Sequence, residues 1–356
     1  MMSADPGAAA RRSEIAVKPV DGPLGIRSRI AAASAGALAI AVAAIVVAPL
    51  IGSTHISIAR AFDWSVPWAT NVDAQIFFVA RLPRVLAAAL VGSALAASGV
   101  ILQALLRNPL ATPFTLGVSA GAALGAMLVL VLGGAMASLS WASVPAASFV
   151  GALAAVGVVY LLAAGRHRGF STGVLLLAGV TLNSFLSALI LLVQYFADMT
   201  QTMQTLRWLL GDLDVAGYRP LVAALPMLAI AYVVFLVLAP SLNLLSLGSD
   251  LAAARGVDVL RVERVAFLTA SLATGAAVSI AGPIGFIGIV VPHLVRMVVG
   301  PDHRLVVPAS LGFGAAFLIG CDLISRTVLA PIDLPVGIVT ALIGGPFFLW
   351  LLVRQS

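Results

Sequence analysis

Long apolar runs separated by short polar segments dominate the chain from residue 30 to its C-terminus. A transmembrane helix needs about 20 predominantly apolar residues, and ten runs approach or exceed that length. They cover residues 30–51, 85–106, 114–134, 142–164, 172–197, 220–239, 264–281, 284–299, 305–329 and 334–353. The pattern predicts an all-α integral membrane protein with about ten transmembrane helices.

The predicted helix over 284–299 differs from the others, because it has only 16 residues and follows the Gly-Pro pair at 282–283. Proline lacks a backbone N–H and clashes with the preceding turn, so a helix does not continue through this pair. The glycine-rich run 282–288 is not a dinucleotide-binding fingerprint, since no strand precedes it and its spacing differs. We expect this run to be a flexible or close-packed re-entrant segment, and the stretch up to residue 299 to include a short, partial helix.

The composition agrees with a lipid environment. Hydrophobic residues make up 61% of the 356 residues and charged residues only 10%, against about 45–50% and about 25% in soluble domains. The apolar run at 30–51 is also longer than the roughly 7–15 residues of a cleaved signal peptide, which predicts an uncleaved first span. The chain therefore divides into a polar tail, 1–29, and a ten-helix membrane domain, 30–356.

The basic residues are distributed unevenly between the two sides of the predicted bundle. With the tail in the cytoplasm, fourteen of the 20 basic residues fall inside and six fall outside. This split obeys the positive-inside rule and predicts that both termini are cytoplasmic. The basic residues also occur in ones and twos along the chain, whereas nucleic-acid binders gather them on one face. We therefore expect membrane lipid and no nucleic acid as surroundings.

Few residues are suited to catalysis or metal binding. Lys18 is the only lysine, so the chain has no P-loop, and Cys321 is the only cysteine, which excludes an intrachain disulfide and a Cys-ligated metal site. The sequence has neither a Ser-His-Asp arrangement nor an HExxH motif. We expect no enzymatic activity, no cofactor and no metal site in this chain.

Ionisable residues inside transmembrane helices are rare, and they often mark the path of a substrate or an ion. Here they are His293, Arg296, Asp322 and Arg326. Asp322 and Arg326 are four residues apart, which predicts an ion pair on one helix face, and His293 is expected to pack or to bond a carbonyl near a helix end. A stand-alone secondary transporter, with a coupling-ion site of carboxylates or broken-helix carbonyls, is the alternative from another class.

Several longer motifs resemble one family of membrane proteins. They are Arg81-Leu-Pro-Arg84 with the run up to Ala111, Thr115–Ala122, Leu175–Gly179, Gly282–Arg296, Asp302-His-Arg304 and Leu334–Thr340. In this order they are similar to the permeases of bacterial ABC importers for ferric siderophores, haem and cobalamin. The resemblance extends from about residue 30 to the C-terminus.

The resemblance implies an inner-membrane protein with ten transmembrane helices and both termini in the cytoplasm. Its partners would be a second permease copy or a paralogous permease, two ATPase subunits and one extracytoplasmic substrate-binding protein. ATP hydrolysis would belong to the separate partner chain. A ferric siderophore is the leading cargo, and cobalamin or haem is the alternative.

Three groups of residues match functional positions of that family. Arg81, Arg84 and Arg326 match arginines at the outer rim that meet acidic residues of the binding protein, with anchoring at the membrane interface as the alternative. Gly248, Ala252 and Gly256 match the spacing of the segment that seats in the ATPase. An amphipathic loop is the alternative there, and Arg255 replaces a leucine that is common in the family.

The resemblance also implies a gate on the cytoplasmic side. Asn108, Pro109 and Leu110 at the end of the second predicted span, with Thr172 at the start of the fifth, match the family's gate. Gly173 departs from the pattern, since some members carry a hydroxyl at that position. Helix capping by Asn108 and Thr172 is an equally good explanation of these residues.

Overall fold

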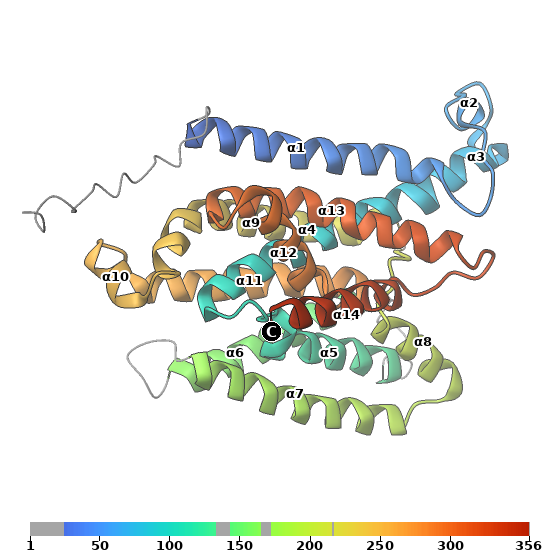
Figure 1. Ribbon diagram of the computed structural model, residues 1–356. Coiled ribbons are helices and arrows are strands. Elements are labelled where there is room, and N and C mark those ends of the chain that lie inside the picture. Colours follow the sequence, from blue (N-terminus) through green and yellow to red (C-terminus); the bar gives the residue numbers. More distant parts are fainter. Residues whose placement is uncertain (1–24, 133–142, 165–171, 216, 356) are drawn as a thin grey trace, which may run out of the picture.

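The computed structural model describes residues 25–132, 143–164, 172–215 and 217–355. Every regular element in these ranges is helical, and none is a strand, which confirms the predicted all-α class. The long helices lie side by side in one bundle (Figure 1). Residues 1–24, which form most of the predicted polar tail, lie outside the described ranges.

Seven segments are long and apolar enough to cross a membrane. Their main helices are α1 (Ile26–Val47), α4 (Leu82–Leu106), α6 (Ser143–Ala164), α7 (Thr172–Tyr195), α9 (Arg219–Leu245), α11 (Val259–Ala281) and α13 (His303–Thr327). Three further apolar helices are shorter in their apolar part: α5 (Val118–Leu132), α12 (Ile287–Val299) and α14 (Val336–Gln355). Each predicted run overlaps one of these helices, and the number of membrane crossings remains a prediction.

Short elements connect the long helices. They are η2 (Ala48–Leu50), α2 (Ile58–Ala61), η3 (Trp68–Thr70), α3 (Val72–Gln75), η4 (Ile76–Arg81), η5 (Pro113–Leu116), α8 (Met199–Leu209) and α10 (Ser249–Ala254). We name the two ends of the bundle after a feature of each. The arginine end is where α4 begins and α13 ends, and it carries Arg81, Arg84 and Arg326. The opposite end is the α10 end, where α1 begins (Figure 1).

Helix α4 is the centre of the bundle, and 89% of its apolar window is buried. Small residues make this possible, because they let helix backbones approach closely in lipid. A Cβ atom on Gly92 would collide with the carbonyl oxygen of Gly314 on α13, and one on Gly99 would collide with Gly288 on α12. The small residues noted in the sequence therefore form helix contacts.

Helices α5, α6 and α7 pack together on one side of α4, and α1 lies on the other side against α13 (Figure 1). The contact between α1 and α13 is again made by small residues, since a Cβ on Gly312 would collide with Ala37. Only 11% of the apolar window of α1 is buried. This helix is therefore held along one narrow stripe.

The break between α11 and α12 explains the short helix that the sequence predicts. Gly282 has a φ of 68° and Phe286 a φ of 67°, so the chain turns through left-handed backbone before α12 begins at Ile287. A side chain at Gly282 would also collide with the carbonyl oxygen of Trp208 on α8. The segment is close-packed, as expected, and glycine is needed at 282 for both conformation and space.

Candidate docking, coupling and gate sites

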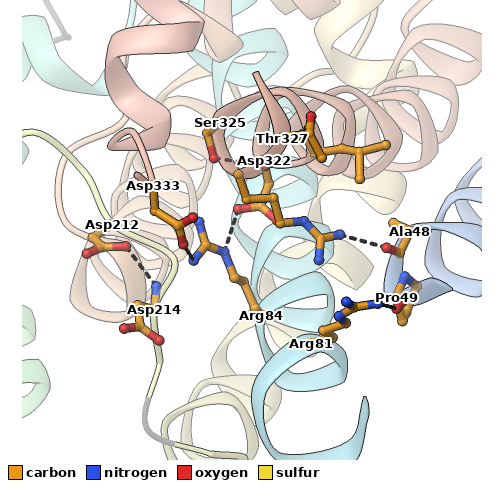
Figure 2. A network of polar contacts seen from close by, with 12 residues as sticks. Ala48, Pro49, Arg81, Arg84, Asp212, Asp214, Asp322, Ser325, Thr327 and Asp333 are labelled. Carbon is orange, nitrogen blue, oxygen red and sulfur yellow. Dashed lines mark hydrogen bonds and ion pairs between the residues drawn. The ribbon is translucent and has the colours of Figure 1, made fainter. Parts of the chain in front are cut away.

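The arginine end contains a network of ion pairs centred on Asp322 of α13. This carboxylate is fully buried and accepts a hydrogen bond of 2.8 Å from Nε of Arg84 on α4. Nη1 of Arg84 also donates to Oδ2 of Asp333, in the loop between α13 and α14, at 3.0 Å. Figure 2 shows Arg84 reaching between the two carboxylates. Arg84 therefore joins a buried charge to an exposed one.

Arg326 is the second cation next to Asp322. Its Nε lies 3.5 Å from Oδ2 of Asp322, which confirms the pair predicted from their spacing. Neither of these two atoms has a hydrogen-bond partner among the described residues, so the contact between them is electrostatic. The directional bond of Arg326 goes elsewhere, from Nη2 to the carbonyl oxygen of Ala48 at 2.6 Å.

Arg81 is held in the same way by the end of α1. Its Nη1 donates to the carbonyl oxygen of Pro49 at 3.0 Å, and its Nη2 donates to that of Thr54. Pro49 belongs to η2 and Thr54 to the segment after it, so Arg81 binds backbone carbonyls of the chain that follows α1. Arg81 and Arg326 together satisfy the carbonyls just after α1 (Figure 2).

These contacts limit which of the predicted docking arginines can touch a partner protein. Arg81 is 7% exposed and Arg326 is 6% exposed, because both side chains are used to hold the end of α1. Direct contact with a partner protein requires more exposure than either has in this structure. Of the three, Arg84 is the one that reaches an exposed carboxylate. The docking role itself remains a prediction.

The same end exposes carboxylates that sequence reasoning did not connect with the arginines. Asp212 and Asp214 lie in the segment between α8 and α9, where Oδ1 of Asp212 accepts a hydrogen bond of 2.9 Å from the backbone N–H of Asp214. Figure 2 shows both on the side of Arg84 that also carries Asp333. No periodicity or motif relates these residues to α4, so only the fold brings them together.

At the α10 end, the segment predicted to couple to an ATPase forms a short helix between two turns. Gly248 has a φ of 126° and Gly256 a φ of 83°, a region that residues with a Cβ rarely adopt. A Cβ at either position would meet no atom within 4 Å. Both glycines are therefore required for the turns, and close packing within this chain is not the reason for them.

The side chains of this segment divide into a buried and an exposed set. Ala252 is fully buried, whereas Leu247 is 62% exposed and Leu251 is 59% exposed. Leu247 precedes α10 and Leu251 belongs to it. Two large, exposed apolar side chains at this place are typical of a contact surface. These leucines were not among the predicted coupling residues, although apolar residues inside a polar connection are a signal that the sequence contains.

The predicted gate residues form a tight turn after α4. Arg107 ends the helix with a φ of 47°, and Oδ1 of Asn108 accepts a hydrogen bond of 2.9 Å from the backbone N–H of Leu110. The side chain of Asn108 thus stabilises a turn and caps no helix. Thr172 is the first residue of α7, and its side chain lies outside the described part of the chain.

A small cavity of about 50 Å³ lies beside this turn. Pro109 and Leu110 line it together with His293 and Arg296 of α12 and Phe347 of α14. The ring of His293 packs edge-on against Phe347 at a centroid distance of 5.9 Å, which confirms that it packs. The predicted position near a helix end is wrong, since His293 lies in the middle of α12. Gln103 holds the arginine in place, since its Oε1 accepts from Nη1 of Arg296 at 2.6 Å.

Asp302 forms a second polar cluster at the α10 end. Its carboxylate accepts three hydrogen bonds from the Arg304 side chain and one from Nδ2 of Asn243. Hydrogen bonds from Arg304, together with the one from Asn243, lower the pKa of this carboxyl to about 2. The Asp302-His-Arg304 motif noted in the sequence therefore fastens the start of α13 to the end of α9.

The geometry can be compared with known proteins. The profile of the FecCD transport family matches residues 39–354. This chain belongs to the FecCD transport family. It is thus a multi-pass ABC transporter permease, a transport subunit, and the resemblance found in its sequence motifs is confirmed.

Individual relatives agree with the family assignment. The chain is 38% identical to the hemin transport system permease protein of Yersinia pestis, over 86% of this chain and 92% of the relative. It is 42% identical to the cobalamin import system permease protein of Halobacterium salinarum, over 83% and 78%.

A solved structure described as a metal-chelate type ABC transporter in an inward-facing conformation is 32% identical to this chain. It superposes with a TM-score of 0.78 over 91% of this chain and 99% of the other.

Proposed function

We propose that this permease carries a metal chelate, a ferric siderophore in the first instance, inward by alternating access. The observation that carries the proposal is the likeness to the metal-chelate type transporter, which covers 91% of this chain at 32% identity. Relatives that carry hemin and cobalamin support haem and cobalamin as alternative cargoes. All three cargoes are metal chelates.

The proposed orientation places the α10 end in the cytoplasm and the arginine end outside. Ten helices would then cross the inner membrane, and both termini would be cytoplasmic. Arginine-rich connections favour the cytoplasmic side, and Arg107, Arg255, Arg261, Arg264 and Arg304 belong to the α10 end. This orientation rests on charge and on the family.

The proposed partners follow from the two ends. Two ATPase subunits would bind the cytoplasmic α10 segment, where the exposed Leu247 and Leu251 offer an apolar contact next to the turns at Gly248 and Gly256. A second permease, either a copy or a paralogue, would complete the central path. Asn108, Pro109, Leu110 and Thr172 would form the cytoplasmic gate of that path.

A substrate-binding protein would dock at the arginine end. Among the predicted arginines we assign the direct contact to Arg84, because its partner Asp333 is exposed and a carboxylate of the binding protein could take that place. Arg81 and Arg326 would support the surface by holding the end of α1. Charges at such a rim contribute mainly to the rate and register of docking.

The secondary-transporter alternative receives less support. It needs an ionisable group that can bind a coupling ion. Asp322 is the buried carboxylate that the sequence singled out, and it is already neutralised by Arg84 and Arg326. The function of this carboxylate is better explained by its ion pairs than by ion transport.

The test is reconstitution in proteoliposomes with the ATPase and binding protein encoded nearest to this chain. A ferric siderophore, haemin and cyanocobalamin would each be offered, with uptake and ATP hydrolysis measured together. We expect one chelate to stimulate both, and the permease alone to hydrolyse no ATP. Uptake that persists without the ATPase would contradict the proposal.

A further inference from the structure

We infer that an anionic phospholipid binds on the flank of α1, with an acyl chain in an apolar groove and its headgroup at the α10 end. This inference goes beyond transport, and it does not depend on the cargo or on the orientation in the membrane. Its evidence is a pair of adjoining cavities with different linings.

The first cavity is an apolar groove of about 480 Å³ between α1, α12 and α13. Its lining includes Ala33, Gly36, Ile40, Leu294, Val298 and Phe313. The groove exists because small residues fill the face of α1 and leave space beside the close contact of Ala37 with Gly312. Its rim is apolar and exposed at the surface of the bundle, since Val298 is 85% exposed.

The second cavity is polar, measures about 390 Å³ and lies at the α10 end of the groove. Its lining includes Arg29, Asn243, Ser246, Gly300 and Asp302. Val299 lines both cavities, and Arg29 lies about one helical turn before Ala33 on α1. A molecule with an apolar chain and a polar head would therefore fill both in one continuous pose.

The charge at the polar cavity favours an anionic headgroup. The carboxylate of Asp302 is neutralised by Arg304 at 2.6 Å. Arg27 and Arg29 have no carboxylate partner among the described residues. Basic pockets beside transmembrane helices bind anionic lipid headgroups, and Arg29 is placed to meet a phosphate.

Two other occupants are conceivable, and lipid fits the groove better. Residues 1–24 contain no apolar stretch longer than four residues, too short to follow a groove of this length. A helix of a second copy could fill the apolar groove but would leave the adjoining polar cavity with Arg29 empty. A phospholipid fills both cavities.

The experiment measures lipid retention by the full-length protein in detergent, using native mass spectrometry with phosphatidylglycerol or phosphatidylcholine added. We expect phosphatidylglycerol to be retained preferentially. Arg29→Gln should lower its occupancy about fivefold, the effect of one arginine at a lipid surface. The matched control is Arg27→Gln, which removes the same charge from the same turn but does not line the cavity.

A second pair of variants tests the acyl groove. Gly36→Leu places a side chain in the groove, where a Cβ meets no atom within 4 Å, and it should reduce retention of both lipids. Gly157→Leu on α6 is the control, because its Cβ also meets no atom and it lines neither cavity. These measurements require no ATPase, binding protein or chelate, so they fail or succeed independently of the proposed function.

Four outcomes would overturn the inference. Unchanged phosphatidylglycerol occupancy in both Arg29→Gln and Gly36→Leu would remove the site. An equal loss in Arg27→Gln and Arg29→Gln would reduce the effect to general surface charge. A rise in occupancy after deletion of residues 1–24 would assign the cavity to the tail. A change of oligomeric state in Gly36→Leu would assign the groove to a second copy.

Discussion

Arg84 on α4 donates a hydrogen bond of 2.8 Å to Asp322 on α13, although the two residues are 238 positions apart in the chain. Both belong to the bundle interior, since Asp322 is fully buried and the Arg84 side chain is 12% exposed. A buried ion pair needs good hydrogen bonding to offset the cost of removing both charges from water. This pair therefore fixes how α4 and α13 meet at the arginine end.

Replacing Asp322 should destabilise the protein strongly. Asp322→Ala leaves Arg84 and Arg326 buried without their common counter-charge, and breaking such a pair costs about 3–5 kcal/mol. Asp333→Ala is the matched control, because it removes an exposed carboxylate from the same arginine and should cost less than about 1 kcal/mol. Thermal unfolding of both purified variants in detergent would separate them, and equal midpoints would contradict the assigned role of Asp322.

Freeing Arg84 from its exposed partner should strengthen docking of the binding protein. Asp333→Asn removes the internal carboxylate that competes for Nη1 of Arg84, and we expect the affinity to rise about two- to fivefold, as for an exposed ion pair. The gain should shrink as salt increases, since exposed charges are screened over about 8–10 Å. Affinity would be measured on membrane-embedded complexes at two salt concentrations.

Asp214→Asn is the control for general charge at this end. It removes an exposed carboxylate for which no bond to an arginine is seen among the described residues. Similar gains in Asp214→Asn and Asp333→Asn would mean that Arg84 is not the docking contact. A loss of affinity in Asp333→Asn would mean that the loop itself is recognised.

The turns on either side of α10 should be disturbed when Gly248 or Gly256 is replaced by a residue with a side chain. Gly248→Ala and Gly256→Ala each force a Cβ into left-handed backbone, at a cost of about 1–2 kcal/mol, so the segment should shift and uncouple transport from ATP hydrolysis. Gly345→Ala is the control, since a Cβ there also meets no atom within 4 Å and its φ is not positive. Uptake per ATP hydrolysed would be compared, and normal coupling in both turn variants would remove this segment from the ATPase contact.

The orientation can be tested with reporters that are active only outside the cytoplasm. A fusion after Ser356 should be silent and one near Ser138, a position outside the described residues, should be active, because the positive-inside rule places these sites on opposite sides. Expression of both fusions would be checked with an antibody to the permease. The reverse pattern would invert the assignment of the arginine end and the α10 end.

The sequence by itself determined the helical class, the positions of the apolar helices, the family and the pair of Asp322 with Arg326. These properties are local, because each can be recognised within one short segment: a run of apolar residues, a glycine in a turn or an i,i+4 spacing. The helix break at Gly282-Pro283 could be predicted for the same reason. The contacts that these elements make with distant parts of the chain could not be predicted from the sequence.

The tertiary structure decided what the three arginines touch. Arg81 and Arg326 bind the carbonyls after α1, and Arg84 joins Asp322 to Asp333. It also decided that an apolar groove and a polar cavity adjoin along α1. No periodicity specifies such pairings, because they depend on which helices are neighbours and at what depth. Helix packing through small residues sets both, and the buried charges then take the partners that lie within reach.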